Sequence, residues 1–290
     1  ALKRSGLNTI QHIDALAVTY GPGLAPALEV GIHWAKKIAT EHHLPLIAVN
    51  HIEGHILSPL LKNSKGVTYS GMGSPRFPLL ALCVSGGHTE LIWVEALGSY
   101  KIIGHTLDDA AGEAFDKVAR MLDLGYPGGA VIAHFAKGGK GTAYELPRPL
   151  YYSKDYHFSF SGLKTSCLYQ TNDLKQELGK DFARIIPNYC ASLQEAITDC
   201  VVNKTVKASH ALQPKMILAG GGVMANIHLR AKLRKALRAL GIPVYFPSFR
   251  FCTDNAAMIA LAGYYKFKRG EIVHDPSTLD RKPSLTLEQA

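Results

Sequence analysis

The sequence lacks the short motifs that identify several common classes of protein. Its five cysteines are scattered and form no CxxC pair, which argues against a disulfide scaffold or a zinc ribbon and favours a reducing compartment. It contains neither a Walker A motif nor GxGxxG, so the common nucleotide-binding folds are not indicated. Charged or glycine- and proline-rich breaks interrupt every apolar run, and no apolar segment follows Ala1. We therefore expect neither a membrane-spanning helix nor a signal peptide.

The composition is that of a folded and basic protein. A chain of 290 residues is long for one core and sufficient for two α/β lobes. A hydrophobic content of 47% with 19% charged residues is typical of soluble folded proteins. The net charge of +9 favours polyanionic partners such as nucleic acid, although a generic basic protein, for example one of the mitochondrial matrix, has the same balance.

Two segments share the order strand, glycine loop and helix, which is typical of parallel α/β sheets. The first spans 14–39 and the second spans 215–240. Their repetition indicates a duplicated lobe with a cleft between the copies, where nucleotides usually bind. The other expected elements are the end of a helix at 1–7, strands at 45–49 and 243–246, an exposed loop at 62–76, a hairpin of 77–84 with 91–94, helices at 112–122, 181–208 and 253–268, an irregular basic stretch at 138–157 and a fraying tail after Asp275.

The sharpest local motif is His51-Ile-Glu-Gly-His55. Two histidines at positions i and i+4 share one face of a helix and can bind one cation, whereas the alternative is a pair of capped or surface histidines. Glu53 lies about 200° around the helix from His51, so it cannot sit beside both histidines as a protease base. Asp254 opens a predicted helix, and its carboxylate can cap that helix or bind the cation as a third ligand. Such a site leaves coordination positions open and suits iron, zinc or magnesium.

Glycine-rich turns suggest a binding site for a nucleotide. Ser85-Gly-Gly-His88 joins two strands, and its amides can approach a phosphate unless it is an ordinary hairpin turn. Gly220-Gly-Gly222 precedes a helix and allows close approach of adenine or ribose, or else tight packing of strand and helix. Asp116 can accept both ribose hydroxyls, with Gly128 and Gly129 nearby, or pair with Arg120 on its helix. A basic helix face can touch phosphates or lie in solvent, and it consists of Arg230, Lys232, Arg234, Lys235 and Arg238.

Together these segments resemble the TsaD/OSGEP family, once called O-sialoglycoprotein endopeptidases. The matching stretches follow the family's order along nearly the whole chain, and eight of them in order are highly specific. They are Val18-Thr-Tyr-Gly-Pro-Gly-Leu24, His51-Ile-Glu-Gly-His55, Val84-Ser-Gly-Gly-His-Thr89, Asp108-Asp-Ala-Ala-Gly-Glu-Ala-Phe-Asp-Lys117, Tyr126-Pro-Gly-Gly129, Phe158-Ser-Phe-Ser-Gly-Leu-Lys-Thr165, Gly221-Gly-Val-Met-Ala-Asn226 and Cys252-Thr-Asp-Asn255.

The resemblance implies a two-lobed actin/Hsp70/sugar-kinase fold and a reaction. The threonylcarbamoyl group would pass from threonylcarbamoyl-AMP, made by an upstream synthase, to N6 of adenosine 37 in tRNAs that read ANN codons. The resemblance implies one divalent metal ion per subunit, held by His51, His55 and Asp254, and binding of an adenylate (threonylcarbamoyl-AMP, ATP or AMP). It assigns no general base. The implied adenylate contacts, with the glycine loop added from the residue pattern, are Val84, Ser85, Gly86, Gly87, Asp116, Gly129, Gly221, Gly222 and Asn226.

The chain departs from the family at its start, where the Gly-Ile-Glu-Thr-Ser-Cys-type strand and the Glu-Leu-Ala-Ser-Arg segment are missing. We expect a first lobe at 1–78 without its N-terminal part, onto which a helix at 254–270 packs, a second lobe at 79–253 and a tail at 271–290. The basic charge and the insertion at 62–76 favour the mitochondrial branch, whose members resemble homodimers of the matrix, over a cytoplasmic protein. The alternatives are a nucleotide hydrolase or kinase of the same superfamily, a metallopeptidase and a non-catalytic binding subunit.

Overall fold

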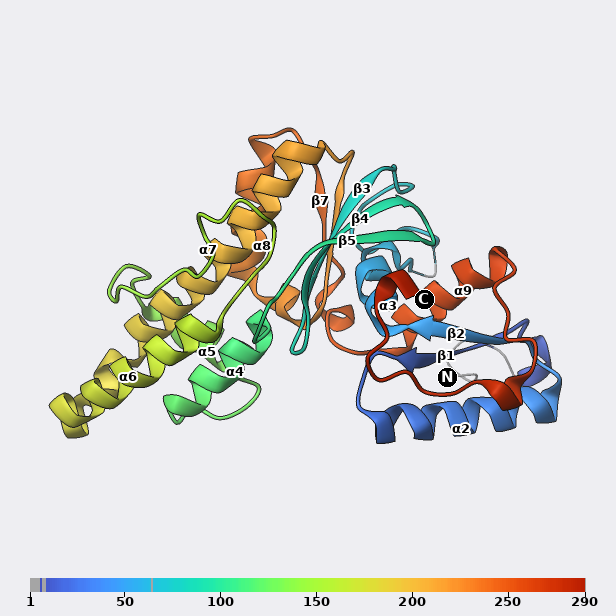
Figure 1. The fold of residues 1–290 in the computed structure, drawn as a ribbon, viewed down its shortest axis with the longest axis horizontal. Coiled ribbons are helices and arrows are strands. Elements are labelled where there is room, and N and C mark those ends of the chain that lie inside the picture. The colour runs from blue at the N-terminus through green and yellow to red at the C-terminus, as the bar shows by residue number, and fades with distance from the viewer. Residues whose placement is uncertain (1–5, 7–8, 64, 290) are drawn as a thin grey trace.

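The computed structural model describes residues 6, 9–63 and 65–289. The helix end expected at 1–7 lies outside these residues, Gly6 excepted. Two sheets organise the described part of the chain, and Figure 1 shows them side by side with α3 between them. No helix in the described part is long and apolar enough to cross a membrane.

The smaller sheet pairs β1 (Leu16–Gly21) with β2 (Leu46–Asn50) in parallel. The connecting helix α2 (Ala25–His42) buries its predicted apolar stripe, including Leu28 and Ile32, against the face that carries Leu46. The alternate residues of β2 point to the opposite face, which is covered by α3 (His51–Leu57) and α9 (Ala256–Lys268). The last helix of the chain therefore packs on its first strands, while the lobe boundaries at 78 and 253 stay a prediction.

The larger sheet has five strands in the order β5-β4-β3-β6-β7. The antiparallel strands β3 (Leu79–Val84), β4 (Thr89–Ala96) and β5 (Ser99–His105) form one half of this sheet. The parallel strands β6 (Ile217–Gly220) and β7 (Val244–Tyr245) continue it beside β3. The pattern did not predict β5.

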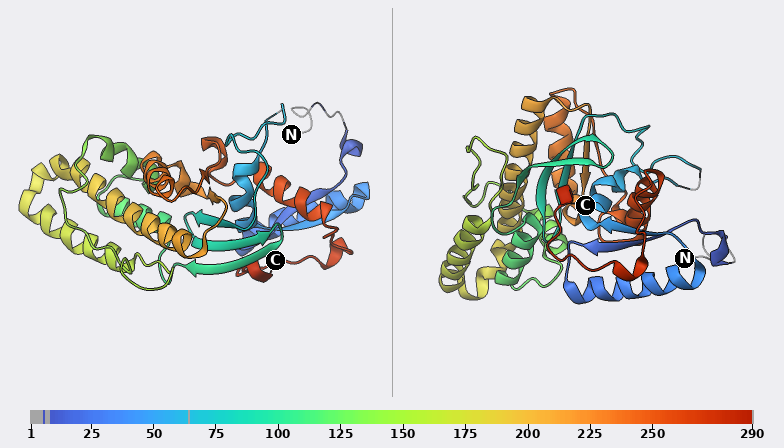
Figure 2. Two further views of the ribbon diagram at one scale, coloured as in Figure 1. Left: turned by 90° about the horizontal axis from the view of Figure 1, so that it is seen from above. Right: turned by 45° about the vertical axis from the view of Figure 1, so that its right-hand side comes forward.

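Helices cover both faces of the larger sheet. Leu80 and Leu82 of β3 join a core with the helices of the second half of the chain, whereas Ala81 and Cys83 face the core that contains α3 and α9. The helices α6 and α7 extend to the end of the molecule farthest from α2 (Figures 1 and 2). The helices on this side are α4 (Ala111–Met121), α5 (Gly128–Phe135), α6 (Ser161–Leu178), α7 (Ile186–Leu212) and α8 (Ile227–Arg238).

The structure changes three expectations about elements. The helical region expected at 181–208 is present as the 3-10 segment Gly179–Ile185 and α7, which continues to Leu212, but the pattern missed α6, which precedes them. The 62–76 segment is not a fully exposed loop, because Lys62 and Thr68 pair across a short turn and both Thr68 and Met72 are buried. The tail does not fray, because the backbone amide of Lys282 donates to the carbonyl of Tyr20 and apolar tail side chains reach the core.

Candidate metal centre

The two histidines of the sharpest motif lie on α3, directly after β2. The side chain of Asn50 at the end of β2 accepts hydrogen bonds from the backbone amides of Ile52 (2.8 Å) and Glu53 (3.4 Å), which fixes where the helix begins. His51 and His55 are therefore one turn apart, and their ring centroids lie 4.7 Å from each other. Because α3 sits between the two sheets, His55 is buried while His51 is partly open.

Asp254 closes the group from about two hundred residues farther along the chain. Its Oδ1 lies 3.3 Å from Nε2 of His51 and 3.1 Å from Nε2 of His55. Hydrogen bonds from His51 and then from His55 hold the pKa of Asp254 well below its usual range. The helix α9 does not use this carboxylate as its cap, because Asn255 accepts from the amide of Met258 instead. The capping alternative for Asp254 is therefore wrong.

The donor set fits a divalent cation. One potential ligand atom from each of His51, His55 and Asp254 lies within 4.8 Å of the others. Two imidazole nitrogens and one carboxylate oxygen suit zinc or iron and leave coordination positions free. Nδ1 of His55 is buried and has no hydrogen-bond partner among the described residues, and the side chain of Asp254 is 78% exposed, so the group is open on the carboxylate side.

Glu53 lies on the other side of α3, as the helical spacing predicts. It is 1% exposed, and its Oε1 accepts a hydrogen bond from the hydroxyl of Tyr100 (2.8 Å) and lies 3.6 Å from Arg269. Burial raises the pKa of Glu53, and this cost is partly offset by Lys266 and Tyr100. Glu53 thus ties α3 to β5 and α9, and it takes no part in the histidine group.

Two glycines bring the ends of β3 and β6 against this group. A Cβ atom on Gly220 would overlap the backbone carbonyl of His55, and one on Gly221 would overlap the carbonyl of Val84. Gly221 also has a φ of 96°, a conformation that favours glycine. Gly222 lies beside Thr253, the residue before Asp254. The glycine loop therefore packs tightly and also lines the space next to the histidines.

The segment Ser85–His88 forms a hairpin turn, and its two glycines leave open space beside the backbone. The amide of Ser85 donates to the carbonyl of His88 (2.8 Å), and the hydroxyl of Ser85 accepts from the amide of His88 (3.1 Å). Gly86 and Gly87 have no atom near the positions their Cβ atoms would occupy. Gly112 at the start of α4 touches the back of this turn. A ligand phosphate can reach the amides of the two glycines without a side chain in the way.

The remaining predicted residues lie on the helices of the second half of the chain. Oδ1 of Asp116 accepts from the amide of Gly128 (2.7 Å), and Asp116 forms no ion pair with Arg120 in the described part of the chain. Gly129, the next residue of α5, has open space where a side chain would be. Asn226 caps α8 through the amide of Leu229 (3.0 Å) and donates to Gln194 (2.8 Å). Hydrogen bonds thus hold the side chains of Asp116 and Asn226 in place, but neither side chain touches the histidine group.

Arg230 departs from both alternatives that the sequence left open for the basic helix face, contact with phosphates or exposure to solvent. It is 6% exposed, and its guanidinium donates to the carbonyls of Met224 and Pro247 and to the sulfur of Cys252. It also lies 4.3 Å from the ring centroid of Phe249. Arg230 therefore holds the segment that leads into Asp254, and neither a phosphate nor solvent can occupy its place. Lys232 is likewise occupied, by Glu195 and Asp199.

His88 is the residue that the sequence reasoning missed. Burial, with smaller contributions from the nearby His51 and His55, lowers its pKa to about 4. A third imidazole therefore lies near the pair. The signal was available, since His88 directly follows the two glycines of the turn.

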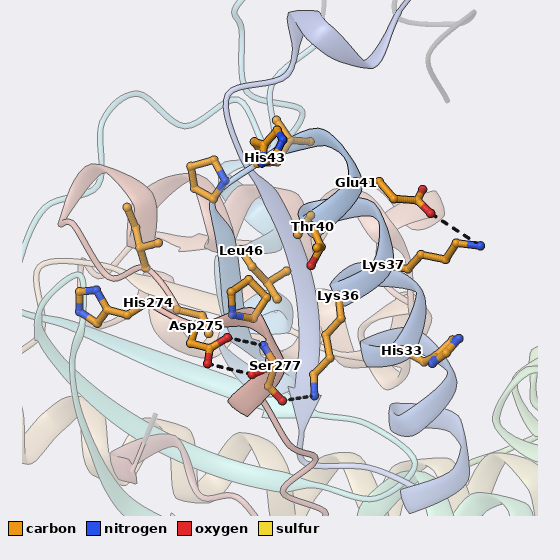
Figure 3. A pocket seen from close by; sticks show the side chains of 16 residues that line it. His33, Lys36, Lys37, Thr40, Glu41, His43, Leu46, His274, Asp275 and Ser277 are labelled. Atoms are coloured by element: carbon orange, nitrogen blue, oxygen red, sulfur yellow. Dashed lines mark hydrogen bonds and ion pairs between the residues drawn. The ribbon is translucent and has the colours of Figure 1, made fainter.

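A hollow of about 1080 Å³ lies elsewhere, between the end of α2 and residues 272–277. Figure 3 shows Lys36 and Ser277 bonded across it, with His43 and His274 on its walls. None of the predicted site residues lines this hollow, so it is separate from the histidine group.

Comparison with known proteins agrees with the order of motifs. Residues 1–261 match the family described as TsaD, tRNA N6-adenosine threonylcarbamoyltransferase. The chain belongs to the TsaD family. A tRNA N6-adenosine threonylcarbamoyltransferase of Polynucleobacter asymbioticus is 46% identical over 266 residues, which cover 91% of this chain and 72% of that protein. The enzyme of the same name from Thermosipho africanus is 44% identical over 280 residues, which cover 96% of this chain and 80% of that protein.

The solved structures that resemble this TsaD chain show its fold. HypF of T. kodakarensis has a TM-score of 0.61 at 14% identity and covers 94% of this chain and 43% of its own. A full-length HypF in a phosphate- and nucleotide-bound form has a TM-score of 0.52 at 14% identity, covering 80% and 38%. The two-lobed actin/Hsp70/sugar-kinase-like fold is thereby confirmed, and the family establishes a transferase that acts in tRNA modification.

Proposed function

We propose that this chain transfers the threonylcarbamoyl group of threonylcarbamoyl-AMP to N6 of adenosine 37 in tRNAs that read ANN codons. The observation that carries the proposal is the match to the TsaD family over 1–261, together with the approach of Asp254 to His51 and His55. In the reaction the adenosine N6 attacks the carbamoyl carbon. The new C–N bond forms, the bond from that carbon to the phosphate oxygen breaks, AMP leaves with the electron pair and the amine loses one proton.

The residues of the chain would divide the work by position. His51, His55 and Asp254 would hold one divalent ion, whose chemistry when bound is that of a Lewis acid and a template for substrate oxygens. The amides of Gly86 and Gly87 would donate hydrogen bonds to the adenylate phosphate, beside Val84 and Ser85. Asp116 and Gly129 would face the ribose, and Gly221, Gly222 and Asn226 would border the nucleoside. His88, which directly follows the two glycines of the turn, would contact the substrate there.

The rival functions have less support. A metallopeptidase of the HExxH type needs the glutamate of that motif beside its histidines as a base, and Glu53 is bonded to Tyr100 on the far side of α3. A kinase or hydrolase of the superfamily has no supporting residue group in the described part of the chain. A non-catalytic subunit would have no need to keep His51, His55 and Asp254 together.

The test is formation of t6A by the purified chain. Unmodified ANN-decoding tRNA, threonylcarbamoyl-AMP and a screen of zinc, iron and magnesium are incubated with the protein, and the digested tRNA is examined by mass spectrometry. We expect product with the wild type, loss of at least a hundredfold with Asp254→Asn, and no loss with Asp280→Asn, an exposed aspartate of the tail. Absence of both product and adenylate binding in the folded wild type would overturn the proposal.

The cellular setting belongs to the same proposal. The pI of about 9.2 supports a place in the mitochondrial matrix, and the resemblance supports a homodimer that receives threonylcarbamoyl-AMP from a separate synthase. Sedimentation of the purified chain tests the dimer, and imaging of the tagged full-length protein tests the location.

A further inference from the structure

Tyr69 lies against the segment Phe249–Phe251, which comes just before Asp254 in the chain. Arg250 stacks over Tyr69 at 4.5 Å and over Phe251 at 4.4 Å from the ring centroids, and these two rings lie 5.3 Å apart. A guanidinium nitrogen of Arg250 also donates to the hydroxyl of Tyr69. Phe249 directly precedes Arg250 in the chain and is 55% exposed. We call Tyr69, Phe249, Arg250 and Phe251 the aromatic platform.

The aromatic platform is held from both sides. Tyr69 is fixed by its amide, which donates to the carbonyl of Leu61 (2.9 Å) at the base of the short 62–68 turn. Phe249–Phe251 form a 3-10 turn closed by the amide of Phe251 on Ser248 (2.8 Å). The buried Arg230 stacks against the inner side of Phe249. The exposed faces are therefore presented by ordered backbone.

The aromatic platform is close to the histidine group. Phe251 precedes Asp254 by three residues, so their Cα atoms are at most about 11 Å apart. Tyr69 is 39% exposed, Arg250 is also exposed, and the side chain of Asp254 is 78% exposed, so all three are accessible to a bound macromolecule.

We propose that the aromatic platform stacks an unpaired base of the tRNA anticodon loop, next to the adenosine that is modified. The inference rests on the proposed function. Proteins recognise single-stranded RNA loops by stacking splayed bases on tyrosine, phenylalanine and arginine planes. Arg250 adds the positive charge that a phosphate backbone requires, on a chain of net charge +9. Loss of one stacking partner weakens binding by roughly tenfold.

The experiment measures binding of an anticodon stem-loop RNA to the full chain by fluorescence anisotropy. We expect Tyr69→Ala and Arg250→Ala each to raise the Kd roughly tenfold, and Tyr69→Trp to restore it, because a larger ring still stacks. The matched control is Trp34→Ala. Trp34 is 54% exposed, and its ring centroid lies 5.3 Å from the amino group of Lys37. Both residues are on α2, which covers the face of the smaller sheet that is turned away from α3. The Kd of Trp34→Ala is expected to stay unchanged.

A second signal reports stacking itself. A 2-aminopurine placed beside the target adenosine should lose fluorescence on binding the wild type and keep it with Tyr69→Ala. Equal Kd values for wild type and both platform variants, an equal loss in Trp34→Ala, or a change in self-association in place of RNA affinity would overturn the inference. AMP binding and t6A formation by the wild type, measured in parallel, report separately on the proposed function.

Discussion

At the scale of single residues, Arg230 shows how a charge can position a site that it does not enter. Its hydrogen bonds to Pro247 and Cys252 join the start of α8 to the segment that ends in Asp254, and its third goes to the carbonyl of Met224 before α8. Replacing Arg230 with methionine leaves two buried carbonyls unpaired, and we expect a loss of about 3 kcal/mol in the free energy of unfolding. Because Asp254 is then less firmly placed, zinc affinity should fall roughly tenfold or more.

Urea unfolding and competition with a zinc indicator measure these two effects of Arg230→Met. The control is Arg238→Met on the same helix, where the side chain is exposed and the expected change is near zero. Arg230→Lys should recover part of the stability, since it keeps the charge with fewer donors. If Arg230→Met and Arg238→Met behaved alike, Arg230 would have no positioning role.

Glu90 on β4 predicts a pH dependence of stability. Burial raises its pKa to about 7, with a smaller contribution from Glu288, and its Oε2 has no hydrogen-bond partner in the part of the chain that the structure describes. A carboxyl group whose pKa is raised in the folded state binds its proton there more tightly, so stability falls as pH rises from the unfolded pKa to about 7. The Glu90→Gln variant should gain up to about 3 kcal/mol over wild type at pH 8 and little at pH 4.5.

Chemical unfolding of Glu90→Gln and wild type at both pH values measures this gain. Glu95→Gln, an exposed position on the same strand, should show no such gain. If the difference in free energy of unfolding between Glu90→Gln and wild type did not grow with pH, the raised pKa of Glu90 would be contradicted.

At the scale of secondary-structure elements, the site depends on how closely β6 approaches α3. Gly220 leaves no room for a side chain against the carbonyl of His55. In the Gly220→Ala variant α3 must move, which we expect to cost about 1–3 kcal/mol of stability and to lower zinc affinity together with it. Gly138→Ala is the matched change, because that position has open space. Zinc titration measures the affinity and thermal unfolding measures the stability of both variants. Normal zinc affinity in Gly220→Ala would show that the site does not require the close approach of β6 to α3.

At the scale of the whole molecule, the tail joins the two sheets. Leu285 packs beside α2 and β1, whereas Leu287 enters the core shared by α3, α9 and the larger sheet. The carboxylate of Glu288 accepts from the amide of Ile102 on β5 (2.7 Å). The last residues therefore cross from one sheet to the other.

Leu287→Ala should destabilise the whole chain by about 2–4 kcal/mol, because it leaves a cavity in the core between the sheets. Leu24→Ala, at a leucine that is 80% exposed, should change stability by less than about 0.5 kcal/mol. Thermal unfolding followed by circular dichroism measures both. Equal melting temperatures for Leu287→Ala and wild type would mean that the tail does not stabilise the packing between the two sheets.

The sequence by itself determined the features that depend on neighbouring residues. The spacing of His51 and His55 places both rings on one face of α3 and Glu53 on another, whatever surrounds the helix. Alternating strand and helix patterns predicted β1, α2, β2, β6 and α8, and the order of the motifs predicted the family. Local periodicity suffices here, because each pattern records which face of one element is buried.

The contacts between segments that lie far apart in the sequence were decided by the tertiary structure alone. It brings Asp254 to the two histidines, turns Arg230 inward from a face that looked basic and solvated, and packs Leu287 of a polar tail into a core. The strand β5 and the helix α6 were missed for the same reason, since neither carries a strong pattern of its own. These outcomes follow from the burial offered by neighbours far along the chain, which local propensity does not encode.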